Sequence, residues 1–384
     1  MSTADLGSAD VAVIGGGLVG TATTYYLAKG GVDVALIERN TAINREASGV
    51  NAGSLHLQIY LHSHLPPDWR QRVAPGVVML REAAKLWATV ETELGQDCGV
   101  RLGGGLWVAE TEEEMVRVRD KVRIENEYGV MSEVLNRNEI LSVAPYLGPH
   151  IIGGSFLKGE GFANPLLTTP AYARSAKKHG ARIVTDAEIK SIEREPDGRF
   201  SLNTPRGIFR ARRVVASAGA WTSEIARMVG LTLPITGVVV QVGVTEGRPS
   251  IMLDQLVQHV SRGLTLKQWP QGGFVIGGGW PGLYDRDTRK KSPALDSLIG
   301  NMAVLMRTVP ESAGAQLVRS WAGVGTGTQD GLAVIGESDR VKGFYVSWAP
   351  LGFTMGPITG KLFAEHFLGR ESTLPIDNYS PNRF

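Results

Sequence analysis

The sequence has almost no cysteine and no long hydrophobic run. Its single cysteine, Cys98, excludes an internal disulfide, a cysteine-based zinc site and a complete cysteine-ligated iron–sulfur cluster within this chain. The longest apolar runs have the length of strands, so we expect no transmembrane segment. Residues 1–9 lack the charged and apolar regions of a signal peptide, and we therefore expect a cytoplasmic protein.

The sequence also lacks a charge excess of either sign. Its 40 basic and 38 acidic residues give a net charge of only +2, which provides no basic footprint for nucleic acid. Hydrophobic residues make up 43% of the chain, as is typical of a globular protein. A length of 384 residues exceeds one ordinary core, and it predicts two closely connected domains.

The most informative stretch runs from Asp10 to Arg39. An apolar run at 10–14 is typical of a buried parallel strand, and a helical segment at 21–29 follows it. A second short apolar run at 32–37 completes a strand–helix–strand unit. This order of elements is the structural context that a dinucleotide-binding glycine motif requires.

Gly15, Gly17 and Gly20 stand between the first strand and the helix with G-x-G-x-x-G spacing. Gly15 suits the tight turn, Gly17 lets backbone approach a pyrophosphate, and Gly20 lets the helix pack closely on the strand. Glu38 follows the second strand, where its carboxylate can accept hydrogen bonds from ribose hydroxyls and would repel a 2′-phosphate. The pattern therefore predicts FAD or NAD binding, against the alternative of a merely structural glycine-rich turn.

A polar segment after this unit is the next candidate for ligand contact. Residues 45–53 are small and polar, which suits either close approach to a ligand or an ordinary surface loop. His56, Gln58, His62 and His64 follow, but they lack H-E-x-x-H spacing and an acidic companion, so we expect no metal site. Alternation with apolar residues instead predicts that His56 and Gln58 share one polar face that lines a pocket.

The rest of the chain alternates between helical and strand patterns. Helices are expected at 75–95, 111–129, 138–144, 166–179 and 293–309, and strands at 181–185, 187–193 and 214–218. The stretch 350–369 is expected to form a glycine-rich turn that opens a final helix. The charged helix at 111–129 is expected to present a solvated face. Residues 231–279 predict an antiparallel sheet, and the glycine-rich stretch at 319–328 predicts a bend that returns towards the first domain.

Five motifs in this order resemble the FAD-dependent D-amino-acid-oxidase superfamily. They are IGGGLVGTATTYYLA with Glu38, SGVNAG, VVASAGAW, TQDGLAVIG and GFTMGPITGKL. The likeness runs from Asp10 to Phe384. It is strongest to the branch with glycine oxidase, the β-subunits of sarcosine oxidase and proline dehydrogenase, and the B-type subunits of opine oxidases.

The resemblance implies an α/β plus antiparallel β fold with two domains. A discontinuous Rossmann-like FAD-binding domain would comprise residues 1–85, 147–225 and 318–384. A substrate domain built on a large mixed or antiparallel sheet would comprise residues 86–146 and 226–317.

The resemblance also assigns residues along a non-covalent FAD. The pyrophosphate would be held by Gly15, Gly17, Leu18, Val19 and Gly20, and the adenosine ribose by Glu38 and Arg39. The flavin side would follow Ser48, Asn51, Ala52, Gly53 and Leu55, with Ile189 presenting its backbone to adenine. Ala218, Gly219 and Trp221 would close over the middle of FAD, and Gly352, Phe353, Thr354 and Met355 would meet the isoalloxazine end.

Three positions depart from the family pattern. Gly325 replaces the carboxylate-binding arginine of glycine oxidase, and Pro165 stands near the histidine that carries covalent FMN in the sarcosine oxidase β-subunit. Val275 stands near the oxygen-activating lysine of monomeric sarcosine oxidase. These departures imply a different substrate clamp, no covalent FMN and weak use of oxygen, while an FMN at a partner interface stays open.

The function that the resemblance implies is an FAD-dependent amine or imino-acid dehydrogenase. Its substrate would be a small secondary amine with a carboxylate, such as an opine, a proline derivative or sarcosine, which passes hydride to flavin N5. Because the flavin performs the chemistry, no catalytic side chain is assigned. His56, His259, Arg262 and Lys267 are the candidates for substrate contact, and each is equally compatible with an ordinary structural role.

The family further implies a β-subunit that works beside an α-subunit and a small iron–sulfur-type subunit. The alternatives are a self-sufficient glycine- or sarcosine-type oxidase that makes H₂O₂, and a chain that holds FAD only to support a redox complex. A flavin monooxygenase or NAD-linked enzyme is disfavoured, because the sequence has neither a Gly-Asp motif before its last helix nor a second G-x-G-x-x-G.

Overall fold

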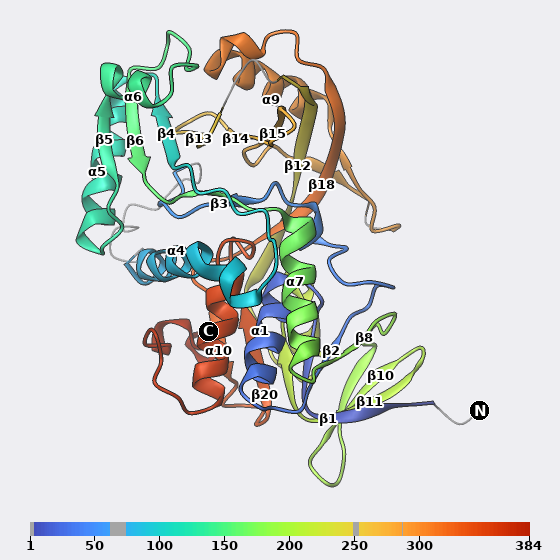
Figure 1. Cartoon of the computed structure of the whole chain (residues 1–384). Helices are drawn as coiled ribbons and strands as arrows, with labels where there is room; N and C mark the ends of the chain where they lie inside the picture. The colour runs from blue at the N-terminus through green and yellow to red at the C-terminus, as the bar shows by residue number, and fades with distance from the viewer. Residues whose placement is uncertain (1–3, 62–73, 249–252, 286) are drawn as a thin grey trace.

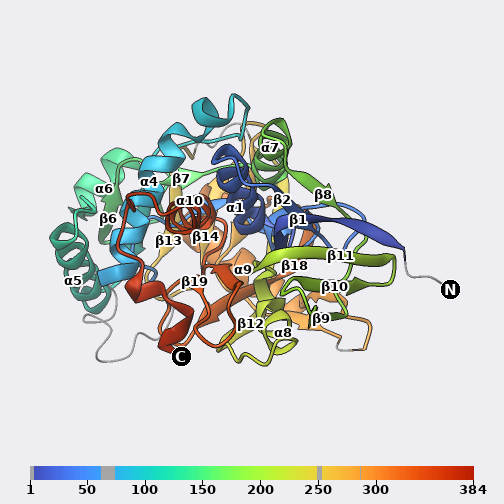
Figure 2. The same cartoon turned by 90° about the horizontal axis from the view of Figure 1, so that it is seen from below.

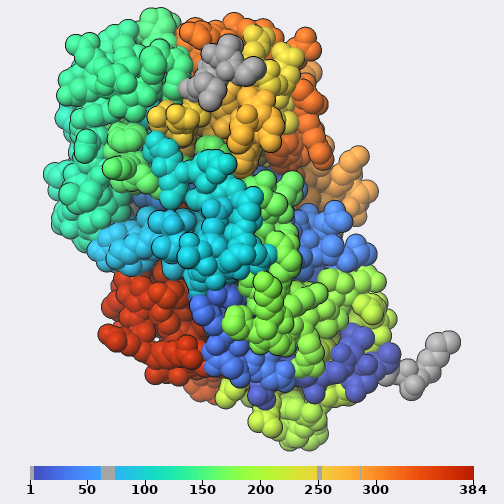
Figure 3. Space-filling model, viewed as in Figure 1, coloured from blue at the N-terminus to red at the C-terminus, as the bar shows by residue number. Residues whose placement is uncertain are grey.

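The computed structural model of the chain describes residues 4–61, 74–248, 253–285 and 287–384 (Figure 1). Two large sheets organise these residues. In the space-filling view, the segments of the first sheet form the lower part of the molecule and those of the second sheet the upper part (Figure 3). Helix α4 (Ala74–Leu94) crosses between them at the front of this view.

The first sheet is the dinucleotide-binding type that the opening motif predicts. Its strands follow the order β19-β20-β11-β1-β2-β8, and all neighbours are parallel except β19 and β20. The strands are β1 (Asp5–Ile14), β2 (Val34–Ile37), β8 (Arg182–Val184), β11 (Gly207–Ala216), β19 (Val334–Glu337) and β20 (Phe344–Trp348). β9 (Ser191–Arg194) and β10 (Phe200–Thr204) extend β11 as an antiparallel meander.

Three helices cover one face of this sheet. α1 (Leu18–Lys29) lies between α7 (Pro165–Lys178) and α10 (Gly356–Phe367), as Figures 1 and 2 both show. Leu18, Tyr25, Tyr172, Ile358 and Phe363 are buried in their shared core. Ten of the twelve residues of α1 are buried, so this helix is a central element rather than a surface one.

The second sheet is mixed and consists mainly of antiparallel pairs. Its strand order is β18-β12-β15-β14-β13-β4-β6-β5, and β13 and β4 form its one parallel pair. Its strands are β4 (Gly105–Ala109), β5 (Glu133–Asn136), β6 (Gly153–Leu157), β12 (Ile235–Gly247), β13 (Leu256–His259), β14 (Thr265–Gln268), β15 (Gly273–Gly277) and β18 (Leu317–Thr328). The predicted fold class, a Rossmann-like domain beside a large mixed sheet, is therefore confirmed.

The remaining elements are short or lie at the periphery of the sheets. The helices are α2 (Ala47–Val50), α5 (Glu112–Glu127), α6 (Arg137–Val143), α8 (Thr222–Arg227) and α9 (Leu295–Thr308). The short strand pairs are β3 (Ser54–Leu55) with β7 (Gly161–Phe162), and β16 (Gly282–Tyr284) with β17 (Lys291–Pro293). Within the described ranges, no helix has both the length and the hydrophobicity needed to cross a bilayer.

Two local predictions were wrong. The glycine-rich stretch at 319–328 is no bend but most of β18, which pairs with β12 from Ile235 to Thr245. Residues 187–190 form no strand, because the chain crosses the end of β2 there and the Ala187 N–H donates to the Glu38 carbonyl at 2.9 Å. The predicted domain boundaries stay a prediction, and hydrogen bonding places β6 and β18 in the second sheet.

Candidate active site

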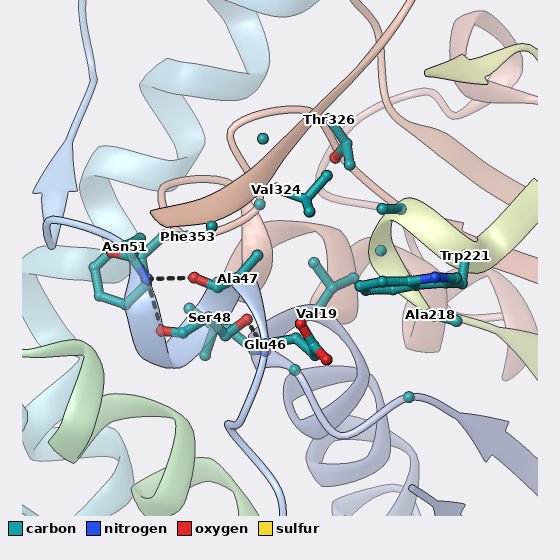
Figure 4. A pocket seen from close by; sticks show the side chains of 18 of the residues that line it. Val19, Glu46, Ala47, Ser48, Asn51, Ala218, Trp221, Val324, Thr326 and Phe353 are labelled. Atoms are coloured by element: carbon teal, nitrogen blue, oxygen red, sulfur yellow. Dashed lines mark hydrogen bonds between the residues drawn. The ribbon is translucent and has the colours of Figure 1, made fainter. Parts of the chain in front are cut away.

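One large cavity, of about 940 Å³, lies where the two sheets meet. Its volume is at the upper end of the range for small-molecule sites. The first sheet contributes the β1–α1 turn and the ends of β2 and β11, and the second sheet contributes β12 and β18. Figure 4 shows Val19 and Ala218 on one side of this space and Val324 and Thr326 on the other.

The β1–α1 turn has the geometry of a pyrophosphate cradle. Gly15 has a φ of +120°, and a Cβ there would lie 2.4 Å from the Ser217 carbonyl oxygen. A Cβ on Gly20 would lie 2.0 Å from the Gly15 oxygen, so only glycine allows α1 to pack this closely. Gly17 is the N-cap residue of α1 and lines the cavity, and Ser48 Oγ accepts the Leu18 N–H at 2.8 Å. The first turn of α1 thus lies at the cavity, where the helix dipole favours an anionic group.

Glu38 lies at the end of β2 and lines the same cavity. One carboxylate oxygen accepts the Gly16 N–H at 2.6 Å, and the other accepts the backbone and side-chain N–H groups of Asn40 at 2.8 and 2.7 Å. The carboxylate therefore ties the glycine turn to the end of β2. Sequence reasoning missed this second role, which exists beside any hydrogen bonds to ribose.

Charged side chains from loops of the first sheet and from the separate β16–β17 hairpin gather at the Glu38 end of the cavity. The Arg39 guanidinium stacks on the Trp221 ring at 3.7 Å and pairs with Glu46 at 2.7 Å. Lys291, on β17, reaches Glu46 at 2.5 Å, and Arg289 reaches Glu188 at 3.5 Å. Lys291 and Arg289 come from the β16–β17 hairpin, and no signal in the sequence placed them here.

Most of the predicted cofactor residues line the cavity. They are Gly15, Gly17, Leu18, Val19, Glu38, Arg39, Ser48, Asn51, Ala52, Ile189, Ala218, Gly219, Trp221, Gly352, Phe353 and Thr354. The predicted cofactor residues that do not line the cavity but lie behind its lining are Gly20, Gly53, Leu55 and Met355. In Figure 4 the Asn51 amide donates to the carbonyl oxygens of Ala47 and Ser48, which shapes the loop beside Phe353. The individual roles of these residues stay a prediction.

His56 also lines the cavity, and three neighbours fix its position. Its Nδ1 lies 2.8 Å from Gln258 Oε1, which makes Nδ1 the protonated nitrogen with the amide in this orientation. Its backbone N–H donates to Thr354 Oγ1 at 3.0 Å. The Tyr60 ring contacts the imidazole edge-on at 4.9 Å. Burial raises the pKa of Tyr60 to about 12, so its phenol stays neutral at physiological pH.

Gln58 does not share the His56 face, contrary to prediction. Its Nε2 donates to Glu160, and its Oε1 accepts from Lys121 Nζ at 2.7 Å and from Ser155 Oγ at 3.0 Å. The strand β3 ends at Leu55, so strict alternation does not continue to residue 58. His62 and His64 lie outside the described residues, and within the described part no group of three His, Cys, Asp or Glu has metal-site geometry.

Lys267 lies on β14 and is fully buried, and it reaches the cavity only through Ser54 rather than lining it itself. Its Nζ donates to Ser54 Oγ at 2.8 Å, and Ser54 lines the cavity. Burial lowers the pKa of Lys267 to about 7. Lys267 also pairs across the sheet with Val275. A lysine is therefore present next to Val275, on the neighbouring strand, although residue 275 itself is a valine.

His259 and Arg262 lie outside the cavity lining and face Glu110 instead. Arg262 Nη2 lies 2.9 Å from Glu110, Arg307 Nε lies 2.7 Å away, and His259 Nε2 lies 3.4 Å away. Burial alone would raise the pKa of Glu110, but hydrogen bonds from Arg307 and Arg262 lower it to about 2. This group joins β4, the β13–β14 turn and α9, and it suits a structural role.

The second sheet offers the cavity an uncharged wall. The lining residues on β12, β14, β15 and β18 are Thr236, Val238, Val240, Gln241, Val242, Thr265, Gly277, Gly323, Val324, Gly325, Thr326, Gly327 and Thr328. A Cβ on Gly325 would meet its nearest atoms, the Val238 oxygen and a Val240 methyl, at 3.8 Å. There is thus space for a Cβ at residue 325, and a longer side chain there would extend into the cavity.

The parallel sheet, the glycine cradle, Glu38 and the cavity together define a class, the dinucleotide-dependent enzymes. Comparison with known sequences defines it further. The model of the family described as FAD dependent oxidoreductase (DAO) matches residues 10–366, so the chain belongs to that family. The resemblance found in the motifs is confirmed. So is FAD as the cofactor, which the glycine cradle and the size of the cavity fit.

Individual relatives are similar over the whole chain. The B-type subunit of opine oxidase from Rhizobium meliloti is 27% identical, with 98% of this chain and 97% of that protein covered. The crystal structure of glycine oxidase from Geobacillus kaustophilus superposes with a TM-score of 0.86 at 26% identity, covering 98% and 99% of the two chains. Mitochondrial dimethylglycine dehydrogenase of Rattus norvegicus is 26% identical, and the alignment covers 98% of this chain but only 45% of that protein. The chain thus spans less than half the length of that relative.

Proposed function

We propose that this chain oxidises the C–N bond of a small amine that carries a carboxylate, of the opine, proline-derivative or sarcosine type. The observation that carries the proposal is the cavity itself, in which the dinucleotide cradle faces an uncharged wall with His56 at its edge. The names of the three relatives, an opine oxidase component, a glycine oxidase and a dimethylglycine dehydrogenase, support an amino-acid-like amine.

Bound FAD supplies the acceptor for the hydride that leaves the carbon beside the amine nitrogen. The residues of this chain then have to orient the amine and keep water away. Val240, Val242 and Gly325 give the apolar surface that excludes water. His56, held by Gln258, offers a hydrogen bond to the substrate nitrogen. No side chain is required to perform the transfer itself, so these residues act by binding and orientation.

The carboxylate of the substrate needs a cation or several donors in such a cavity. Lys267 fits this role better than Arg262, because Lys267 Nζ contacts Ser54 of the lining at 2.8 Å whereas Arg262 pairs with Glu110 outside it. Gly325 supplies no charge. We therefore assign carboxylate binding to Lys267 and Ser54, and His259 and Arg262 drop out as candidates.

The chain is further proposed to be the catalytic β-type subunit of a heteromeric complex with an α-subunit and a small iron–sulfur-type subunit. The support is its full-length similarity to the B-type component of an opine oxidase. One observation favours a second candidate function, a self-sufficient oxidase. A cation near the flavin would stabilise superoxide as it forms, and Lys267 is such a cation beside the cavity wall.

One experiment tests the proposal and separates the two candidates. Substrate-dependent reduction of an artificial dye and formation of peroxide are measured side by side, with the purified chain and a panel of amino-acid-derived amines. Dye reduction that much exceeds peroxide formation supports the dehydrogenase subunit. Equal rates support the oxidase, and no dye reduction with any amine contradicts amine oxidation.

A further inference from the structure

A buried cluster of charged and polar side chains lies directly behind the segment that supplies Ser54, His56 and Tyr60 to the cavity. We call it the Lys121 cluster, and it comprises Gln58, Lys121, Glu125, Ser132, Ser155 and Glu160. Each of these side chains is at most 2% exposed. None of them lines the cavity, so the cluster has no direct part in the proposed chemistry.

One face of α5 supplies the first set of hydrogen bonds to residues 57–61. Arg117, Lys121 and Glu125 recur every four residues and therefore lie on one face of the helix. Arg117 Nη2 donates to the Leu61 carbonyl at 2.8 Å, and Lys121 Nζ donates to Gln58 Oε1 at 2.7 Å. Glu125 Oε1 accepts the Ile59 N–H at 2.6 Å. The charged helix at 111–129 was expected to present a solvated face, but α5 also has a buried face that contains Lys121 and Glu125.

Glu160, just before β7, supplies the second set of hydrogen bonds to this segment. One of its carboxylate oxygens accepts the Leu57 N–H at 2.8 Å and the Gln58 N–H at 3.2 Å. The other oxygen accepts the Gln58 side-chain amide. Two carboxylates from distant parts of the chain therefore hold the backbone N–H groups of three consecutive residues, 57–59.

Burial of these charged groups costs free energy, and the packing around them leaves space for the Glu160 carboxylate. Burying a lysine and two carboxylates costs more than burying apolar side chains of the same size, so such a network is weak evidence for a gain in stability. A Cβ on Gly105 would lie 1.7 Å from the Glu160 carboxylate, so the glycine in β4 leaves the space that this carboxylate occupies. Burial raises the pKa of Glu160 to about 7, although the Gln58 hydrogen bond opposes this shift.

We propose that the Lys121 cluster is a positioning device that holds residues 54–61 so that His56 and Tyr60 keep their places in the cavity. Its members are positioning residues, because they act on the substrate only through that segment. The part of this inference that concerns positioning of the amine substrate rests on the proposed function. Small displacements of orienting groups lower the rate of a reaction that depends on near-attack geometry.

The test compares two variants of the cluster with two matched controls on the exposed side of α5. The cluster variants are Lys121→Met and Glu160→Leu, which removes both acceptor oxygens, and the controls are Arg119→Met and Glu127→Leu, whose wild-type side chains are 49% and 56% exposed. All four are studied as FAD-loaded full chains, at a temperature at which each is folded. Hydrogen exchange of the peptide that contains residues 57–59 is measured first, because it does not depend on any substrate.

We expect the peptide to be protected in the wild type and both controls, and to exchange at least about tenfold faster in both cluster variants. The limiting rate of flavin reduction by a saturating amine should fall at least about tenfold, with unchanged FAD content and unchanged reduction by dithionite. Unchanged exchange, or faster exchange without a slower reduction, would overturn the proposal. If no amine reduces the wild-type flavin, the proposed function fails, and the exchange comparison still decides whether the cluster holds the segment.

Discussion

Lys267 Nζ donates a hydrogen bond to Ser54 Oγ at 2.8 Å, and this contact joins the second sheet to the segment that supplies Ser54 and His56 to the cavity. The two residues are 213 positions apart in the chain. The lysine is fully buried, and Ser54 Oγ is its hydrogen-bond partner among the described residues. A buried ammonium with so little compensation is costly, and a bound carboxylate would offset that cost.

The first prediction follows from this pair. Replacing Lys267 by Met should raise the KM for amines with a carboxylate by about tenfold or more and leave uncharged analogues within about threefold. In the wild type, affinity for the acidic amines should also decrease as the pH rises through about 7, where free Lys267 loses its charge. The uncharged analogues share the titration of the amine and serve as the control. Equal effects of the substitution on both substrate types would remove Lys267 from the carboxylate site.

The second prediction concerns cofactor binding. The purified protein should be yellow with one non-covalent FAD, which acid precipitation releases into the supernatant. Glu38→Ala should weaken FAD binding by about 1–3 kcal/mol, because ribose hydroxyls lose their acceptor and the Gly16 N–H loses its own. Asn40→Ala removes one neighbour of the carboxylate and should have a smaller effect. Colour that stays in the pellet, or unchanged FAD affinity in Glu38→Ala, would contradict this account.

The third prediction concerns the room beside Gly325. An alanine there meets its nearest atoms at 3.8 Å and should be tolerated, whereas leucine should fill part of the cavity. Gly325→Leu should therefore lower kcat/KM for amines with large N-substituents by about tenfold or more and affect N-methyl amines by less than about threefold. Val318→Leu, on the exposed start of the same strand, is the control. Equal losses for small and large amines would show that this part of the wall does not select by size.

The fourth prediction concerns the pH dependence of stability. Burial raises the pKa of Glu160 from 4.5 to about 7, so folding disfavours its charged form. Ionisation of Glu160 should therefore lower the stability of the wild type as the pH rises from about 4.5 to about 7. Glu160→Gln cannot ionise and should gain up to about 3 kcal/mol relative to the wild type over this range. Unfolding is measured by denaturant at several pH values, and parallel pH dependence of the two proteins would refute the shift.

The sequence predicted the features that depend on local spacing. Gly15, Gly17, Gly20 and Glu38 are close in the chain, and the strand–helix–strand pattern defines their arrangement with little help from the rest of the fold. The class of the second sheet could also be predicted, because its short alternating strands are frequent and clear.

The features that depend on long-range packing could not be predicted. Gln58 lies away from the His56 face because a buried carboxylate 102 residues later binds its amide. Arg262 lies away from the cavity because the turn after β13 directs it to Glu110. The buried face of α5 did leave a signal, since Arg117, Lys121 and Glu125 are spaced by four. That spacing alone does not distinguish a buried face from an exposed one.

Anaerobic reduction of the bound flavin tests the central claim most directly. The FAD-loaded chain is mixed, without oxygen, with carboxylate-bearing secondary amines of the opine, proline and sarcosine types, and its absorbance near the flavin maximum is followed. We expect at least one of these amines to bleach the flavin fully in a single turnover and to yield the corresponding carbonyl product after hydrolysis of the imine. A flavin that dithionite reduces but that none of these amines bleaches would contradict the account.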